Sequence, residues 1–274
     1  MTGAAGTGEM KGILHPDEQA RHRSLRRLDV GPALAEFADR YWVVRWDLRG
    51  RPAYRAEVLS FPCVNLTFER TSTRTGGFVN GVSTTKYVRE LDGEGETFGI
   101  RFRPGGFGAF TGCDVAALRD DAAPLTQVLP EARGLAERVL AESHDEHRRV
   151  LIEEFFAGRG RTDDPHYALV SRIVAAMAED SELTRVDQVT ERFAIPVRTL
   201  QRLFRRYVGA GPKWVLRRFR LQDAADLLAH GSPELAELAA GLGYFDQAHF
   251  SREFTAEIGM SPGEYARRTR SAPG

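Results

Sequence analysis

The chain of 274 residues contains little cysteine and no excess of charge of either sign. Its two cysteines, Cys63 and Cys113, are too few for a disulfide framework or a four-cysteine zinc site, which is typical of a reducing cytoplasm. Basic and acidic residues number 38 each, so the overall charge favours neither nucleic acid nor membrane as a partner. No apolar run of about 18 residues occurs, and the N-terminus lacks an apolar segment. The sequence therefore predicts a cytoplasmic protein without a signal peptide or membrane contact.

Histidine is absent between residues 23 and 143. A metal-dependent β-barrel enzyme needs several histidines and a carboxylate on facing strands, and this segment cannot supply them. The stretch "RPGGFG" at 103–108 lacks the Lys-Ser/Thr ending of a phosphate loop, so its glycines are interpreted as turn residues. We therefore expect no catalytic residues, no metal site and no cofactor, and we expect that the protein is not an enzyme.

An internal repeat with an offset of 50 residues is the strongest positive signal. The stretch "LQRLFRRYVGAGPKW" (200–214) aligns with "FSREFTAEIGMSPGE" (250–264). Apolar positions recur at i, i+4 and i+8 in both copies, so one face of each helix is predicted to be buried. The aligned identities are Arg202/Arg252, Phe204/Phe254, Gly209/Gly259 and Pro212/Pro262.

Each copy has the pattern of a helix-turn-helix. Short helices at 186–193 and 236–243 precede the aligned helices. Asp246 can cap the aligned helix of the second copy through its side chain. The paired glycines suit left-handed helix ends, and the paired prolines can open the helices that follow. A long helix from about Pro212 to Ala229, ended by His230-Gly231, is predicted to join the copies.

Basic residues cluster in the first copy. Residues 190–220 contain nine basic residues and one acidic residue, a local charge of +8 in a neutral chain. A solvated helix face usually mixes signs, so this cluster favours contact with phosphates. A duplicated helical bundle that does not bind DNA is the alternative interpretation of the repeat.

Residues 166–269 resemble the DNA-binding domain of AraC-type transcriptional regulators. The resemblance rests on "LAAGLGYFDQAHFSREFTAEIGMSPGEYARR" in the second copy and "LQRLFRRYVGAGPKWVLRRFRLQDAADLL" in the first. It implies seven helices, with two helix-turn-helix units whose recognition helices enter successive major-groove segments on one face of the DNA. Carried over by position, it implies a first recognition helix that opens near Pro196, where family members commonly have a capping serine. The implied groove-facing residues are Arg198, Gln201, Arg202, Gln247, Ala248, Ser251 and Arg252.

Residues 30–112 contain several short alternating stretches divided by turns. "YWVVRWDL" (41–48), "CVNLTFE" (63–69) and "TFGIRFRP" (97–104) predict a small antiparallel β-sandwich or barrel, preceded by a helix at 32–40. With "GIRFRPGGFGAFTG" at 99–112, the region resembles the cupin-like sensor domain that precedes the DNA-binding domain in many AraC-type proteins. Trp42 and Trp46 are candidate ligand-binding residues, although burial in the core is the favoured interpretation.

The chain is thus expected to be an α+β multidomain protein. Its expected parts are an N-terminal extension (1–29), a β-barrel sensor or dimerisation domain with C-terminal helices (30–157), a linker (158–165) and an all-α AraC-type DNA-binding domain (166–270). The helices before the linker, one of them opened by a Ser143–Glu146 capping box, either pack on their own barrel or pair two subunits.

These observations predict a bacterial, sequence-specific DNA-binding transcription regulator. Candidate partners are double-stranded DNA, a small-molecule effector, RNA polymerase and a second copy of the chain. One alternative is a ligand-independent regulator whose barrel only dimerises. Another is a DNA-binding module fused to a barrel with enzymatic activity, metal-dependent or in repair, as in DNA-repair methyltransferases. The repair reaction needs a reactive cysteine and a zinc-binding cysteine cluster.

Overall fold

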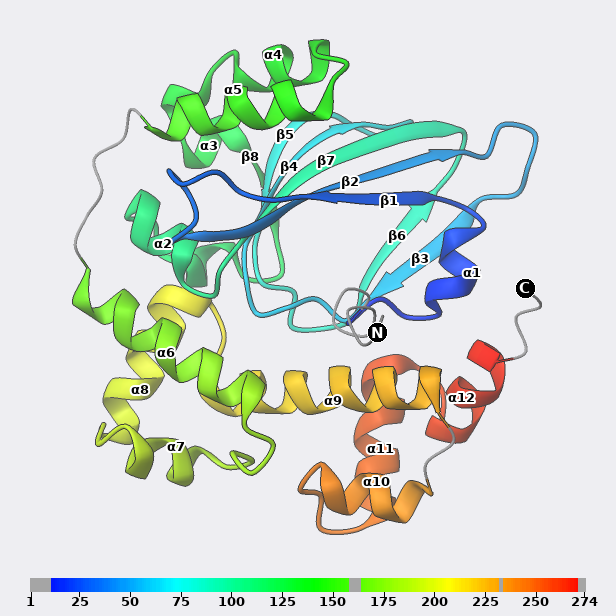
Figure 1. The fold of residues 1–274 in the computed structure, drawn as a ribbon, viewed down its shortest axis with the longest axis vertical. Helices are drawn as coiled ribbons and strands as arrows, with labels where there is room; N and C mark the ends of the chain where they lie inside the picture. Colours follow the sequence, from blue (N-terminus) through cyan, green and yellow to red (C-terminus); the bar gives the residue numbers. More distant parts are fainter. Residues whose placement is uncertain (1–10, 158–163, 232–233, 271–274) are drawn as a thin grey trace, which may run out of the picture.

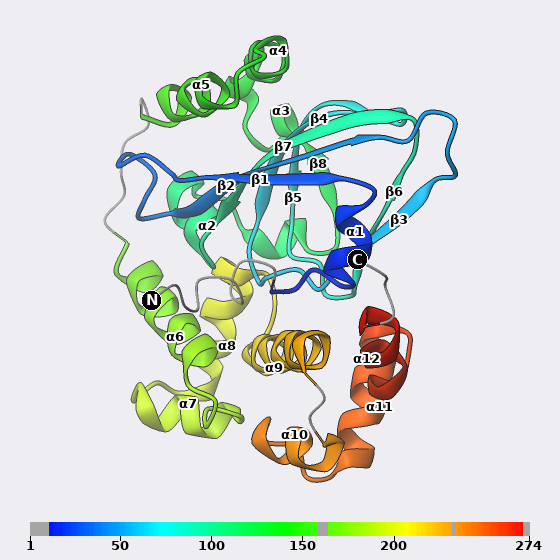
Figure 2. The same ribbon diagram turned by 45° about the vertical axis from the view of Figure 1, so that its right-hand side comes forward.

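The computed structural model describes residues 11–157, 164–231 and 234–270, which form a β-rich N-terminal part and a helical C-terminal part (Figures 1 and 2). Within these ranges no helix is long and apolar enough to cross a membrane. The strands form two antiparallel sheets, one with the order β1-β2-β7-β4-β5-β8 and one that pairs β3 with β6. The strands are β1 (Ser24–Leu28), β2 (Ala38–Asp47), β3 (Tyr54–Val58), β4 (Asn65–Arg70), β5 (Thr75–Asn80), β6 (Tyr87–Leu91), β7 (Glu94–Phe102) and β8 (Ala122–Pro124).

The predicted antiparallel β-domain is confirmed, but the described strands do not close into a barrel. The edges of the larger sheet are β1 and β8, and among the described strands β3 and β6 pair with each other, while Val58 of β3 also bridges Ile13. Residues 13–28, which the sequence assigns to an extension, contribute helix α1 (Pro16–Ala20) and strand β1, which pairs along its length with β2. The α1–β1 segment is therefore part of the β-rich region.

One face of the larger sheet forms an apolar core with the helices that follow it. Phe98, Ile100 and Phe102 of β7 are fully buried, as are Ile152 and Phe156 of the last of these helices. Figure 1 shows the helices α3, α4 and α5 together on this side. The elements are α2 (Gly106–Thr111), η1 (Val115–Leu118), α3 (Leu125–Val128), η2 (Pro130–Ala132), α4 (Leu135–Ala141) and α5 (Asp145–Ala157).

Polar contacts also fasten α5 to the sheet. The Arg148 guanidinium donates two hydrogen bonds of 2.9 Å to Glu96 of β7, and Arg45 of β2 pairs with Asp145. The helices after the sheet therefore pack on their own sheet, one of the two arrangements that the sequence allows. The Ser143–Glu146 capping box is wrong, because Glu142 Oε1 accepts the backbone N–H of His144 (2.8 Å) and the helix begins at Asp145.

The predicted helix at 32–40 is also wrong. Residues 32–37 form turns, and β2 begins at Ala38. The backbone of Phe37 is held by tertiary contacts, since its carbonyl accepts the Arg103 N–H (2.8 Å) and a Cβ at Gly106 would collide with it. The loop after β7 therefore takes up a carbonyl that would otherwise be available to a helical turn.

Seven helices and a π-helical turn make up the described C-terminal part. Two helix-turn-helix units lie towards the two ends of α9, on the side away from the larger sheet (Figures 1 and 2). The elements are α6 (Pro165–Glu179), α7 (Val186–Arg192), α8 (Val197–Leu203), the π-helical turn η3 (Phe204–Val208), α9 (Pro212–His230), α10 (Leu235–Gly241), α11 (Gln247–Ile258) and α12 (Pro262–Arg270). The two-domain fold class expected from the sequence is confirmed.

The ends of the repeat helices follow the sequence prediction. Gly209 and Gly259 adopt φ values of 82° and 89° at the helix C-termini. Pro212 and Pro262 are the first residues of α9 and α12, and the connecting helix ends at His230. In the first copy the helix widens into the π-helical turn η3, where the Gly209 N–H donates to the Phe204 carbonyl five residues earlier (3.0 Å).

Helix α9 belongs to two hydrophobic cores. Val215, Leu216 and Phe219 in its first half join the core of the larger sheet and the first helix-turn-helix unit. Its second half joins the core of the second unit, which also includes Leu14 and Leu59 from the N-terminal part. The two halves of the repeat are thus buried against different parts of the β-rich region.

The positive φ of the two repeat glycines predicts a loss of stability when either is replaced by alanine. Gly259→Ala should lower the free energy of unfolding by roughly 1–2 kcal/mol, because an L-residue is strained at positive φ. Gly209→Ala should cost more, because its Cβ would also lie 3.1 Å from Val115 Cγ1 and from the Val115 carbonyl. Gly241→Ala is the control, since nothing lies within 4 Å of its Cβ position. Urea denaturation measures all three, and equal losses for the first two variants would contradict the assigned Val115 contact.

Candidate nucleic-acid interface

The first recognition helix is α8, which follows a turn at residues 193–196. Pro196 occupies the N-cap position and provides no side-chain cap, as its chemistry requires. Leu200 and Phe204 are fully buried and fix the helix to its bundle. The predicted reading residues Arg198, Gln201 and Arg202 all lie on the exposed face.

The second recognition helix is α11, and it is capped as predicted. The Asp246 carboxylate accepts the His249 N–H at 2.6 Å. Phe250, Phe254 and Ile258 are fully buried on one face. On the opposite face Gln247, Ala248 and Arg252 are exposed, and Ser251 is half-buried.

The arginines on these exposed faces are available for a ligand. In the described ranges, the side chains of Arg198, Arg202 and Arg252 have neither a hydrogen bond nor an ion pair with another residue. Arg202 and Arg252 also occupy equivalent places in the repeat. Long cationic side chains without protein partners, placed on two equivalent helices, can bind phosphates or guanine edges.

The basic cluster at residues 190–220 is weaker than its sequence suggests. Arg192 pairs with Asp180, and Arg217 pairs with Glu257 of α11. Arg218 is 1% exposed and faces Glu257 at 3.5 Å. Arg206 donates to the Gly112 carbonyl (2.6 Å), so it too is engaged inside the protein. Acids outside the window therefore neutralise part of the +8 charge, while Arg198, Arg202, Arg205 and Lys213 stay exposed.

Two exposed apolar side chains at the starts of the recognition helices were not identified from the sequence. Phe245, next to the α11 cap, is 94% exposed, and Val197, the first residue of α8, is 45% exposed. The available signal was the pair Tyr244-Phe245, because two consecutive aromatic residues in a tight turn rarely share one core. Tyr244 is the buried member, and its hydroxyl donates to Glu253 (2.5 Å).

The candidate ligand-binding residues Trp42 and Trp46 lie together in the β-rich part. Both line a cavity of about 240 Å³ between the larger sheet and the β3–β6 sheet. Trp46 is 5% exposed and Trp42 is half-buried. The apolar core lies on the opposite face of β2, where Tyr41 and Val43 are buried. Both indoles therefore border the cavity on the face opposite the main core, and Trp46 also packs in a small apolar cluster with Leu48, Ala56 and Leu91.

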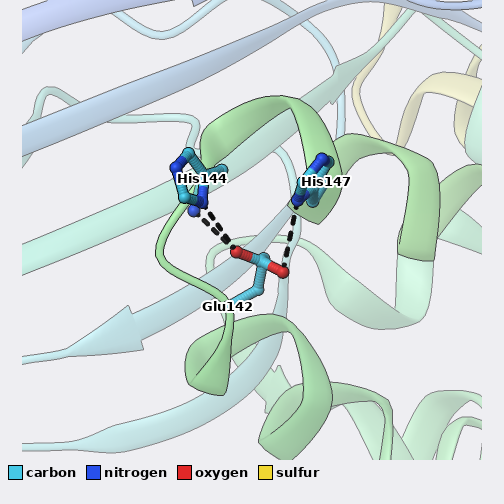
Figure 3. Close-up of side chains that lie close together, drawn as sticks. All are labelled: Glu142, His144 and His147. Atoms are coloured by element: carbon cyan, nitrogen blue, oxygen red, sulfur yellow. Dashed lines mark hydrogen bonds and ion pairs between the residues drawn. The ribbon is translucent and has the colours of Figure 1, made fainter.

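A second surface cluster contains groups that bind metals in other settings. Figure 3 shows His144 and His147 facing the two oxygens of Glu142, with Nδ1–O distances of 3.3 and 3.5 Å. The backbone hydrogen bond from His144 is the main cause that lowers the Glu142 pKa to about 2. Two imidazoles and a carboxylate could hold a divalent cation such as Zn²⁺. Both histidines are exposed, and the carboxylate already accepts from the backbone at the α5 N-terminus. We assign no metal-binding role to this cluster.

Comparisons with known proteins match the two parts of the chain separately. Residues 189–268 match a family described as "Helix-turn-helix domain", and residues 27–124 match a "Domain of unknown function (DUF6597)". The HTH-type transcriptional activator RhaS of Escherichia fergusonii is 32% identical over 37% of each chain. The activator RhaR of Klebsiella pneumoniae is 34% identical over 42% of each chain. The chain therefore spans about two fifths of the length of these curated relatives.

One solved structure is the DNA-binding domain of AdpA, a global transcriptional factor, in complex with a target DNA. It is 27% identical, covers 41% of this chain and 100% of that chain, and has a TM-score of 0.36. The AraC-type resemblance of the helical part is confirmed by the family match and the activator matches. The cupin-like resemblance of the N-terminal part is not confirmed by them.

The different burial of these arginines predicts different effects on stability when each is replaced by alanine. Arg202→Ala and Arg252→Ala should change the free energy of unfolding by no more than about 0.5 kcal/mol, because both side chains are exposed and unbonded. Arg218→Ala should cost about 3 kcal/mol, because this buried guanidinium donates to the Thr84 carbonyl (2.9 Å) and faces Glu257. Thermal and urea unfolding provide the comparison. A large loss for Arg202→Ala would mean that its side chain supports the fold.

Proposed function

We propose that this protein, whose C-terminal part is an AraC-type helix-turn-helix domain, is a sequence-specific DNA-binding transcription regulator. The observation that carries the proposal is the pair of helices α8 and α11. Each has one fully buried apolar face and one exposed face with arginine, glutamine or serine side chains. A structural helix of a bundle does not require unbonded arginines at equivalent positions of both copies.

In this proposal the exposed side chains read base edges in the major groove. Arg198, Arg202 and Arg252 can each donate two parallel hydrogen bonds to guanine, and Gln201 and Gln247 can bond adenine. Ser251 accepts or donates at either purine, and Ala248 allows close approach of the helix. The exposed Arg205 and Lys213 are placed to neutralise phosphates, which fix the register without reading sequence.

Phe245 adds a proposed apolar contact. A phenyl ring that is 94% exposed at the start of a recognition helix loses contact with water on binding, and it can pack on a thymine methyl group. Its neighbours Asp246 and Gln247 open the same helix. Phe245 would therefore add a preference for an A·T pair next to the bases read by α11.

For the N-terminal part we propose a sensing role, with dimerisation as the second possibility. The cavity behind Trp42 and Trp46 supports sensing, because a ligand there would be enclosed by both sheets. A small-molecule effector, a second copy of the chain and RNA polymerase remain proposed partners, and the cytoplasm is the proposed location. The α4–α5 pair covers its own sheet with its buried residues, so any dimer would use its outward face.

The enzymatic alternative receives no support from Cys63. The thiol of Cys63 is buried, and burial raises its pKa to about 11. Such a thiol is protonated at neutral pH and is a poor nucleophile. The Asn65 amide donates a weak hydrogen bond to Cys63 Sγ at 4.0 Å. In the described ranges no second thiol and no imidazole is paired with Cys63.

The proposed contacts predict how substitutions in the recognition helices change DNA affinity and base preference. On a duplex recovered by selection from a random library, Arg202→Ala and Arg252→Ala should each weaken binding by about 1–3 kcal/mol. Each should also relax the preference at one base pair, because a base contact is lost. Phe245→Ala should relax the preference at a neighbouring A·T pair. Binding isotherms on single-position sequence variants measure both effects.

The matched control is Arg138→Ala, which removes an exposed arginine of α4 far from the recognition helices. It should leave affinity and preference unchanged. A variant that weakens binding to all duplexes equally, and reduces the slope of log K against log salt concentration by about 1, would indicate a phosphate contact. Wild-type affinity in both recognition-helix variants would contradict the proposed interface.

A further inference from the structure

The cavity between the two sheets has a built aromatic floor. Trp42 and Trp46 lie opposite Gly99 and Gly95 of the neighbouring strand β7, and a Cβ at either glycine would collide with the indole ring. Each ring therefore lies over a glycine on one side and borders the cavity on the other. The indole nitrogens are already bonded, Trp42 to Asn65 Oδ1 (3.2 Å) and Trp46 to the Asp92 carbonyl (3.0 Å). What the rings contribute to the cavity is flat apolar surface, which favours a planar or apolar ligand.

The charged lining of the same cavity is mostly positive. Among the described residues that line it, the one carboxylate is Glu69, which is 1% exposed and already accepts from Arg74, Arg89 and the Thr67 hydroxyl. The cationic lining residues are Lys11, Arg23, Arg27, Arg40, Arg89 and Arg101. Two carboxylates outside the cavity neutralise part of this charge: Asp39 is shared by Arg40 and Arg101, and Asp223 pairs with Lys11 (2.5 Å). The cavity thus has more positive than negative charge among its walls.

Arg23 is the cation whose environment calls for an anion. Its Nε and Nη2 donate to the neutral Gln19 Oε1 at 2.9 and 2.7 Å. Burial, opposed by Tyr54 and reinforced by the neighbouring Arg27, lowers the pKa of Arg23 to about 10. A guanidinium that loses hydration without an acidic partner is costly, and a bound carboxylate would offset that cost through charge-assisted hydrogen bonds.

The size of the cavity limits the ligand. At about 240 Å³ it lies below the roughly 300–1,000 Å³ typical of drug-sized ligand sites. Asn80 lies on the same lining, and because both of its N–H groups already donate, its side-chain oxygen can accept a hydrogen bond from a ligand hydroxyl or ring N–H. One or two rings, or an aliphatic chain of similar volume, would fill the space.

We propose that this cavity binds a small organic carboxylate, with its apolar or aromatic body on Trp42 and Trp46 and its carboxylate at Arg23. The inference rests on the proposed sensing role of the N-terminal part and names the ligand class of that role. The β3–β6 sheet that walls the cavity also contacts the DNA-binding part, because Lys86 bridges Glu57 of β3 and the carbonyl of Ile258 at the end of α11 (2.9 and 2.6 Å). Occupation of the cavity is thereby connected to the second recognition helix.

The test uses the full chain and three pairs of probes: phenylacetate, 3-phenylpropanoate and 2-naphthoate, each with its neutral amide. Titration calorimetry should show at least one acid that binds at least about tenfold more tightly than its amide. Arg23→Gln should reduce that preference to about threefold or less without weakening the amide. Trp42→Leu should weaken the acid and the amide together, since it removes the apolar contact of both.

Two further variants keep the result interpretable. Arg23→Lys keeps the charge and should keep the preference, and a melting curve for each variant verifies folding. Arg26→Gln is the matched control, because Arg26 lies on β1 three residues after Arg23, is exposed and pairs with Asp145 outside the cavity. The proposal is overturned if no acid binds more tightly than its amide, or if Arg23→Gln keeps the full preference.

DNA binding measured without any probe separates this proposal from the proposed function. Arg23→Gln should bind the selected duplex as the wild type does. If the wild-type protein binds DNA but binds no acid more tightly than its amide, only the cavity assignment is overturned. Intact acid binding in a protein that binds no DNA overturns only the regulator assignment.

Discussion

The burial of α9 is the constraint on which the rest of the molecule depends. Its first half packs with the larger sheet and α8, and its second half packs with α11 and with Leu14 and Leu59. The helix has 19 residues, which corresponds to roughly 28 Å. Successive major-groove segments on one face of B-DNA lie about 34 Å apart. A helix of this length, buried at both ends, holds two recognition helices at a separation of the right order.

Polar contacts along α9 join the β-rich part to the reading helices. Arg218 donates to the Thr84 carbonyl in the loop between β5 and β6, faces Glu257 of α11 and lies over the Trp214 ring (4.8 Å). Gln222, one turn later, donates to the Leu59 carbonyl at 2.6 Å. Lys86 also donates to the Ile258 carbonyl at the end of α11. The loop between β5 and β6 and strand β3 therefore connect the cavity with the second recognition helix. The β-rich part and the helical part are therefore joined by side-chain contacts as well as by the chain.

The sequence could predict most of the reading part, because its signals are local. The spacing of apolar residues in each copy, the positive-φ glycines, the opening prolines and the Asp246 cap are each decided within a few residues. It could not settle the sheet. In "YWVVRW" both faces of β2 carry large apolar side chains, so alternation alone does not tell Tyr41 and Val43, which are in the core, from Trp42 and Trp46, which border the cavity. Strand β1 has two arginines in five residues and gives no strand signal. The charge of residues 190–220 was overestimated because Asp180 and Glu257 lie outside that stretch.

The most direct test of the account is where the protein touches DNA. Hydroxyl-radical and dimethyl sulfate footprinting on a selected duplex should show two protected major-groove segments, centred about 10–10.5 base pairs apart on one face. That pattern follows from two recognition helices held at opposite ends of a buried α9. A single protected segment, or two segments on opposite faces of the duplex, would contradict the central claim that α8 and α11 read DNA together.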